Sequence, residues 1–204
     1  MDLINDLDGG VNLIVQVGTE NILLTWDLEH RTGCRRILCY DDWVWSEDLY
    51  LTEDPDIDIS GANMAFLCWA GCDEISECHK VKAKSGPLDE FAEFVGPGID
   101  VLVIDGDKRV PKLLGFLQYL APLVRPGGLI VGAGWDGRWS VEVRLAVRSY
   151  WTEDEFRVDK LLMAGDYLAE CFWKKTYEAD DYRYNALQAG DDDPWRPVGD
   201  ISDT

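Results

Sequence analysis

A strand-helix-strand unit at residues 100–137 constrains the fold of this 204-residue chain more than any other feature. Its first strand is the apolar run at residues 101–104, which is typical of a parallel strand buried on both faces. Apolar residues then recur at helical spacing over residues 110–124, and Pro126-Gly127-Gly128 predicts a turn. Because residues 129–131 form a second apolar strand, the unit predicts a right-handed parallel crossover.

Acidic residues follow the first strand of this unit, in the sequence Asp105-Gly106-Asp107-Lys108. The second strand is followed by residues 133–136, which end in Asp136. Ligands of open α/β sheets bind beyond the carboxyl ends of the strands. We therefore expect both segments to border a binding site.

Two segments of this unit resemble class I S-adenosylmethionine-dependent methyltransferases. In that family the fourth strand ends in an IDGDH- or VDADK-like turn, as in Ile104-Asp105-Gly106-Asp107-Lys108, and a (K/R)PGG turn introduces the fifth, as in Arg125-Pro126-Gly127-Gly128. The resemblance covers roughly residues 11–175 and is nearest to small-molecule O-methyltransferases. It implies an α/β, Rossmann-like fold with a seven-stranded, mostly parallel sheet and a C-terminal antiparallel hairpin, its last strand inserted beside the fifth.

The remaining segments alternate between strand and helix, as this fold requires. We expect strands at residues 12–17, 36–40 and 79–84, helices from the Gly18 turn to about Glu29 and at 63–70, 88–95 and 139–150, and a hairpin of strands at 156–164 and 167–174. Alternating lysines predict that the strand at 79–84 lies at a sheet edge.

Length and composition favour one domain, because 204 residues with 47% hydrophobic content can bury one medium-sized core. We interpret residues 1–10 as an acidic lead-in, residues 11–177 as the methyltransferase-like domain and residues 178–204 as an acidic tail.

The charge of the chain disfavours several classes of partner. Nineteen basic against 39 acidic residues give a net charge of −20, which repels phosphate backbones and anionic lipids. We expect a small-molecule acceptor, no nucleic acid and no membrane partner. The sequence has neither an apolar run of membrane length nor a basic-then-apolar start, so the default expectation is a cytoplasmic protein. The oligomeric state stays open, a homo-oligomer included.

Six cysteines allow two interpretations. Cys68, Cys72 and Cys78 with His79 can be drawn as zinc ligands, but their gaps differ from the paired spacing of a structural site. We favour buried, reduced thiols, with Cys34 and Cys39 as packing positions beside a strand.

The resemblance also implies a site for S-adenosylmethionine. Its turn after the first strand matches Gly18, Thr19 and Asn21, although only one glycine is present there. A carboxylate at the end of the second strand can accept both ribose hydroxyls, which suits Asp41, although an acid there can also simply end a strand. The expected cofactor site contains Gly18, Thr19, Asn21, Asp41, Trp43 near the adenosine, Ser85 near the adenine, and Asp105.

Methyl transfer from a sulfonium is an in-line displacement that needs alignment and, for a hydroxyl acceptor, removal of a proton. Lys108 stands where the family places a catalytic Lys or His, so the hypothesis gives it the role of general base, beside Asp105. Two other interpretations remain open: Lys108 can be an exposed surface charge, or it can form a structural ion pair with Asp105 or Asp107.

Metal ligands are incomplete by comparison with the cation-dependent relatives. In those proteins a divalent ion binds the aspartate that ends the fourth strand, matched by Asp105, and an Asp-Asn pair at the end of the fifth. The pair aligns with Ala133 and Gly134, which have no side-chain oxygen. Asp107 and Asp136 lie off this pattern, so we expect no tight catalytic metal.

Two functional hypotheses follow from different classes. The first is a metal-independent O-methyltransferase of a small hydroxylated molecule. The second is a degenerate methyltransferase-fold protein that serves as a binding or partner subunit. A nicotinamide-dependent Rossmann enzyme fits poorly, because Gly18-Thr19-Glu20-Asn21 is not G-x-G-x-x-G.

Overall fold

The computed structural model of the chain describes residues 10–18, 22–41, 81–84, 86–162 and 168–176, together with Ile4 and Leu7. Several predicted features lie outside these residues. They are most of the acidic lead-in, the helix at 63–70, Cys68, Cys72 and Cys78, the hairpin turn at Gly165-Asp166 and the acidic tail.

Among the described elements, strands and helices alternate except between β2 and β3 and in the final pair of strands. The strands are β1 (Leu13–Val17), β2 (Arg36–Tyr40), β3 (Val81–Lys84), β4 (Ile99–Ile104), β5 (Val124–Gly132), β6 (Arg157–Leu162) and β7 (Leu168–Lys175). The helices are α2 (Ile22–Thr32), α4 (Leu88–Val95), α5 (Val110–Leu120) and α6 (Ser140–Tyr150), with a short 3-10 helix, η2 (Ala121–Leu123). In the described residues none of these helices is long and apolar enough to cross a membrane.

Among the described residues the strands form one seven-stranded sheet in the order β3-β2-β1-β4-β5-β7-β6. Strands β1 to β5 pair with one another in parallel, whereas β7 runs antiparallel to both β5 and β6. This arrangement confirms the predicted Rossmann-like α/β fold with a seven-stranded, mostly parallel sheet and with the C-terminal hairpin inserted beside the fifth strand. It also places β3 at an edge of the described sheet, as its alternating lysines predict.

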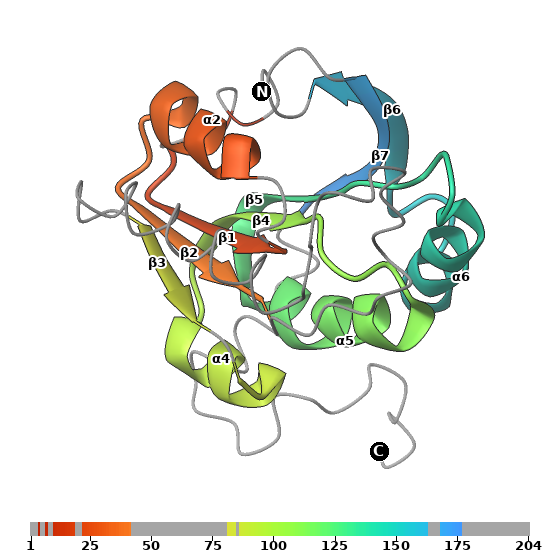
Figure 1. Ribbon diagram of the computed structural model, residues 1–204, viewed down its shortest axis with the longest axis horizontal. Helices are drawn as coiled ribbons and strands as arrows, with labels where there is room; N and C mark the ends of the chain where they lie inside the picture. The colour runs from red at the N-terminus through yellow and green to blue at the C-terminus, as the bar shows by residue number, and fades with distance from the viewer. Residues whose placement is uncertain are drawn as a thin grey trace, which may run out of the picture.

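Helices cover both faces of the sheet, with α2 on one side and α4, α5 and α6 on the other (Figure 1). Successive strand residues alternate between these two layers, because side chains of a strand point to opposite faces. In β1, Val15 packs in the core beneath α5, whereas Ile14 packs in the core beneath α2. The apolar runs are continuous because both faces of the strands are buried.

The prediction of a turn at Pro126-Gly127-Gly128 is wrong, because these residues are part of β5. Ile99 pairs with Val124 and Val101 pairs with Leu129, so residues 125–128 of β5 lie opposite the single residue Asp100. The extra residues form a bulge, which bends the strand without ending it. The preceding helix ends at Leu120, so Val124 belongs to the strand rather than to the helix.

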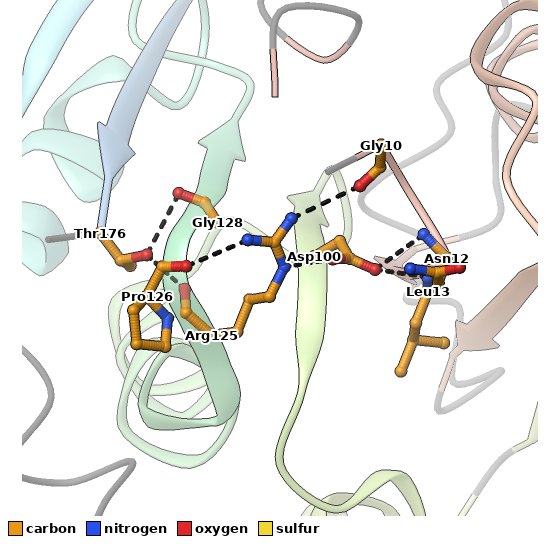
Figure 2. Close-up of polar contacts among 8 residues, drawn as sticks. All are labelled: Gly10, Asn12, Leu13, Asp100, Arg125, Pro126, Gly128 and Thr176. Carbon is orange, nitrogen blue, oxygen red and sulfur yellow. Dashed lines mark hydrogen bonds and ion pairs between the residues drawn. The ribbon is translucent and has the colours of Figure 1, made fainter. Parts of the chain in front are cut away.

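The bulge brings Arg125 next to the buried carboxylate of Asp100 (Figure 2). Arg125 Nε donates to one oxygen of Asp100, and the backbone N–H groups of Asn12 and Leu13 donate to the other at 2.8 Å each. The guanidinium also donates to the carbonyl of Gly10 at 3.4 Å. One carboxylate therefore joins β4, the start of β1 and the bulge of β5.

Thr176 holds the other side of the same bulge. Its hydroxyl donates to the carbonyls of Arg125 and Gly128, and its backbone N–H donates to the Gly128 carbonyl at 2.9 Å. The N–H of Gly127 returns a hydrogen bond to the Thr176 carbonyl at 2.8 Å. The end of β7 is thus fastened to the same place as Asp100 (Figure 2).

Backbone also meets backbone at the opposite ends of β1 and β4. A Cβ atom on Gly18 would lie 2.3 Å from Gly106 Cα and 2.7 Å from the Asp105 carbonyl carbon, distances that no real side chain adopts. Gly18 also has a φ of +86°, which favours glycine. The two turns that follow β1 and β4 can approach this closely because position 18 has no side chain; a Cβ atom on Gly106 would be tight as well, at 3.3 Å from Gly18 Cα.

The hydrogen bonds accepted by the Asp100 carboxylate give a first prediction. Asp100→Ala removes the acceptor of two backbone N–H groups and of a partly buried guanidinium, so we expect the free energy of unfolding to fall by about 2–3 kcal/mol. Glu153→Ala is the control, because Glu153 belongs to an exposed ion pair with Arg148 and should cost less than ~0.5 kcal/mol. Urea denaturation measures the free energy of unfolding of both variants. Equal losses would show that the contacts of Asp100 stabilise the fold no more than an exposed ion pair does.

The glycine contact gives a second prediction, with a control of almost the same backbone conformation. Gly137 has a φ of +82°, but a Cβ atom added there would meet nothing within 4 Å, so Gly137→Ala carries only the conformational cost. Gly18→Ala adds a clash with backbone that cannot rotate away. We expect Gly18→Ala to lower the unfolding free energy by about 2 kcal/mol more than Gly137→Ala. A difference near zero in thermal or urea unfolding would contradict the close approach.

Candidate functional site

The candidate site lies at the carboxyl ends of β2, β1, β4 and β5. The sheet order reverses direction between β1 and β4, since the chain continues from β1 outward to β2 and β3 and then returns to β4. Crevices at such a reversal are the usual ligand sites of open α/β sheets. Backbone hydrogen bonds fix the strand ends there: Gly18 N–H donates to Tyr40 O and Asp105 N–H donates to Val17 O, each at 2.8 Å.

Four of the residues predicted for the site are described by the structure, and it brings them to this edge. Gly18 touches the Asp105-Gly106 backbone, Asp41 directly follows the Tyr40 carbonyl that binds Gly18, and Lys108 contacts Asp105. The other four, Thr19, Asn21, Trp43 and Ser85, lie outside the described residues and stay predictions.

Tyr40 extends this edge toward β3. Its hydroxyl donates to the carbonyl of Gly86 at 2.8 Å, which ties the segment after β3 to the end of β2. Its ring is buried against Phe91 and Phe116, with centroids 4.8 Å and 6.0 Å away. Tyr40 therefore anchors the strand end that carries Asp41, a role that the sequence pattern did not indicate.

A buried amide beneath the first turn is a second feature that the sequence pattern did not predict. Gln16 Nε2 donates to the Gly18 carbonyl and Gln16 Oε1 accepts from the Thr25 hydroxyl, both at 2.8 Å, and both side chains are fully buried. A buried amide must be paired, so this network fixes the orientation of the Gly18 peptide. The signal that could have found it is the single polar residue within the apolar strand LIVQV.

Lys108 is held against the turn that follows β4. Its Nζ donates to Asp105 Oδ1 at 3.0 Å and lies 3.4 Å from the backbone carbonyls of Asp105 and Gly106. The side chains of Lys108 and Asp105 are 20% and 21% exposed, so both remain accessible from solvent. Three oxygen acceptors around one nitrogen suit an ammonium group, which has three N–H donors and no acceptor.

Gly134 makes room for this lysine at the end of β5. A Cβ on Gly134 would lie 2.8 Å from both Cδ and Cε of Lys108, so the lysine stem passes directly over the glycine. The backbone of Gly134 has a φ of +89°, which also favours glycine. From the sequence alone, position 134 was notable only because it lacks the metal-ligating side chain that cation-dependent members of the family have there.

Asp107, the second carboxylate of this turn, is paired with Arg109. Burial raises the pKa of Asp107, but hydrogen bonds and the charge of Arg109 outweigh that effect and leave the pKa below its ordinary value. The Asp107 carboxylate therefore binds the guanidinium of Arg109 instead of facing the Asp105 carboxylate.

A buried thiol lies beneath the same charges. Burial raises the pKa of Cys171 to about 12, and the negative charges of Asp105 and Asp136 add to the shift while Lys108 opposes it. Cys171 is a buried, reduced cysteine, as Cys34 and Cys39 are, which confirms the packing role predicted for the last two. The thiol stays protonated at neutral pH and serves as an apolar floor.

The oxygen donors near Asp105 do not form a metal site in the described part of the chain. No group of three or more His, Cys, Asp or Glu side chains comes together there. The Lys108 ammonium lies 3.0 Å from the Asp105 carboxylate and already neutralises it. The residues present therefore do not fit the divalent ion of the cation-dependent relatives.

Comparisons with known proteins give likenesses in structure rather than in sequence. No protein-family model matches the sequence, and no curated protein matches it. Among solved structures, the chain is similar to the O-methyltransferase from Bacillus cereus bound to S-adenosylhomocysteine, with a TM-score of 0.52 and 15% identity over 82% of this chain and 75% of that one.

Two further solved structures are similar to the same degree. An rRNA methylase from Streptococcus thermophilus has a TM-score of 0.52 at 10% identity, covering 87% of this chain and 93% of that one. Spermidine synthase from Thermotoga maritima has a TM-score of 0.52 at 12% identity, covering 85% of this chain and 55% of that one. With its strand order, its inserted hairpin and these likenesses, the chain has the fold of the class I S-adenosylmethionine-dependent methyltransferases.

Proposed function

We propose that this chain is an S-adenosylmethionine-dependent methyltransferase that O-methylates a small hydroxylated molecule without a tightly bound metal. The observation that carries the proposal is the meeting of Gly18, Asp41 and Asp105 at the reversal of the sheet. In an open α/β sheet this is where a nucleoside ligand binds. The similar Bacillus cereus structure is an O-methyltransferase in complex with S-adenosylhomocysteine, which supports this choice of cofactor and reaction.

The described residues fit the adenosyl cofactor in three respects. The first turn presents backbone rather than side chain, because Gly18 has no Cβ, and Gln16 fixes its peptide. Asp41 supplies a carboxylate for the ribose hydroxyls at the end of β2. Asp105 stands at the opposite lip of the crevice, at the end of β4. The cofactor itself supplies an activated methyl group on a sulfonium.

The acceptor is expected on the side of Lys108. The chain's own task is to align the acceptor oxygen with the methyl group and to exclude water, since in-line displacement needs no covalent nucleophile. Lys108 is only partly exposed and points its charge toward Asp105 at this edge. The hypothesis that it acts on the acceptor oxygen, as a general base, stays a proposal.

The second hypothesis, a degenerate methyltransferase-fold protein that serves as a partner subunit, predicts a different result for cofactor binding. A partner subunit would not need the cofactor crevice, so titration calorimetry with S-adenosylmethionine and S-adenosylhomocysteine separates the two functions. Saturable one-to-one binding of either ligand supports the enzyme. Heat-free titrations with both ligands, from a protein shown to be folded, would support the scaffold instead.

Asp41 gives a third prediction. Asp41→Ala removes a charge-assisted pair of hydrogen bonds to the ribose, so we expect S-adenosylhomocysteine to bind more weakly by about 2 kcal/mol. Asp89→Ala serves as the control, because Asp89 is an exposed acid in the first turn of α4 and removes the same charge. If both variants bind as tightly as the parent in calorimetry, the ribose assignment to Asp41 is wrong.

Lys108 gives a fourth prediction. If Lys108 acts on the acceptor oxygen, Lys108→Ala should slow single-turnover methyl transfer ~10²–10⁴-fold, while the dissociation constant of S-adenosylhomocysteine changes little. Lys160→Ala is the control, since Lys160 is exposed on β6. A chelator should change neither protein's rate. Lost stability with an unchanged rate would instead indicate a purely structural ion pair, and complete loss of activity on chelation would indicate a required metal.

A further inference from the structure

Tyr40 is bonded to neighbouring strand ends through both its backbone and its side chain. Its carbonyl accepts a hydrogen bond from the N–H of Gly18, and its hydroxyl donates to the carbonyl of Gly86, each at 2.8 Å. Gly18 follows β1 and Gly86 lies just beyond β3, so one residue of β2 joins the ends of three strands that are neighbours in the sheet. Asp41, the carboxylate proposed for the ribose, is the next residue in the chain.

The packing of the Tyr40 ring fixes the direction of its hydroxyl. The ring is buried against Phe91 of α4 and Phe116 of α5, with centroids 4.8 Å and 6.0 Å away. A ring packed against two others in a dense core has little room to change its rotamer. The hydroxyl is therefore aimed at Gly86 by the core and does not depend on the hydrogen bond for its orientation.

The segment that accepts this hydrogen bond has few constraints of its own. Gly86 has a φ of +119°, a conformation open to glycine, and Pro87 has no backbone N–H. Pro87 also precedes α4, and its carbonyl accepts from the N–H of Phe91 at 3.1 Å. The Tyr40 hydroxyl thus fixes a glycine carbonyl at the point where the chain passes from β3 into α4.

The position of this segment relates to one half of the proposed cofactor. The sulfonium and the base are bonded to carbons at opposite ends of the ribose. Lys108, on the proposed acceptor side, follows β4, which is separated from β2 by β1. With the ribose at Asp41 and the sulfonium toward β4, the base extends toward the end of β3, where Gly86 lies.

We propose that Tyr40 is a positioning residue for the adenosine half of the cofactor. Its hydroxyl holds the segment after β3 at a fixed place beside the end of β2, so that the ribose and the base meet a preformed site. Tyr40 acts through Asp41 and Gly86, because its own ring is buried in the core. This inference deepens the proposed function and rests on it, since it takes S-adenosylmethionine to bind at this edge of the sheet.

The test is calorimetric titration of Tyr40→Phe, which removes the hydroxyl and keeps the ring. Without the hydroxyl, the segment after β3 is in the binding arrangement for a smaller fraction of the time, and the apparent dissociation constant rises in proportion. We expect S-adenosylhomocysteine to bind about five- to tenfold more weakly. Adenosine, measured by competition, should weaken by the same factor, because it contains the whole part of the ligand that faces this segment.

Thr176→Val is the matched control, because it removes another buried hydroxyl, at the opposite end of the sheet. That hydroxyl donates to the carbonyls of Arg125 and Gly128. Both variants should lower the free energy of unfolding, since each leaves a carbonyl without its partner. Only Tyr40→Phe should change the two dissociation constants, which separates the positioning of a ligand from a general loss of stability.

Three results overturn the proposal in a parent that binds S-adenosylhomocysteine. The first is equal affinity of the parent and Tyr40→Phe. The second is equal weakening by Tyr40→Phe and Thr176→Val, which lost stability alone would explain. The third is weaker binding of S-adenosylhomocysteine with unchanged binding of adenosine, which would assign the effect to the other half of the ligand. A folded parent that binds neither ligand overturns the proposed function and this inference together, so the two failures are distinguishable.

Discussion

The buried carboxylate of Asp100 is the interaction on which the geometry of this sheet depends. It lies at the amino end of β4, where it accepts hydrogen bonds from the start of β1 and from Arg125 in the bulge of β5. Three neighbouring parallel strands are therefore aligned at one end by a single side chain. The candidate site lies at the other end of the same strands, so their alignment decides which turns meet there.

At that other end β1 and β4 are held together by direct contact and hydrogen bonding between their backbones. Gly18 and Gly106 touch without side chains between them, and the buried amide of Gln16 orients the peptide that follows β1. A sheet fixed at both ends of β1 and β4 can present Asp41, Asp105 and Lys108 on rigid supports rather than on long loops. Such preorganisation suits a reaction whose main requirement is alignment.

The sequence predicted the fold because its strands are continuous apolar runs and its terminal hairpin has its own signal. It could not predict that residues 125–128 form a bulge, because a bulge is defined by the strand opposite, here by Asp100. Likewise, the contact between Lys108 and Gly134 joins two positions far apart in the chain. Gly18, Asp41 and Asp105 could be placed by their strand ends, whereas the parts assigned to Thr19, Asn21, Trp43 and Ser85 remain predictions.

The passage of the Lys108 stem over Gly134 also gives a position without a functional group an influence on the charge of the site. Any other residue at position 134 would have to adopt a φ of +89°, and its Cβ atom would push Cδ and Cε of Lys108 aside. The lysine ammonium would then leave its place beside the Asp105 carboxylate. The absence of a side chain at one strand end thus decides where a charge from another strand end lies.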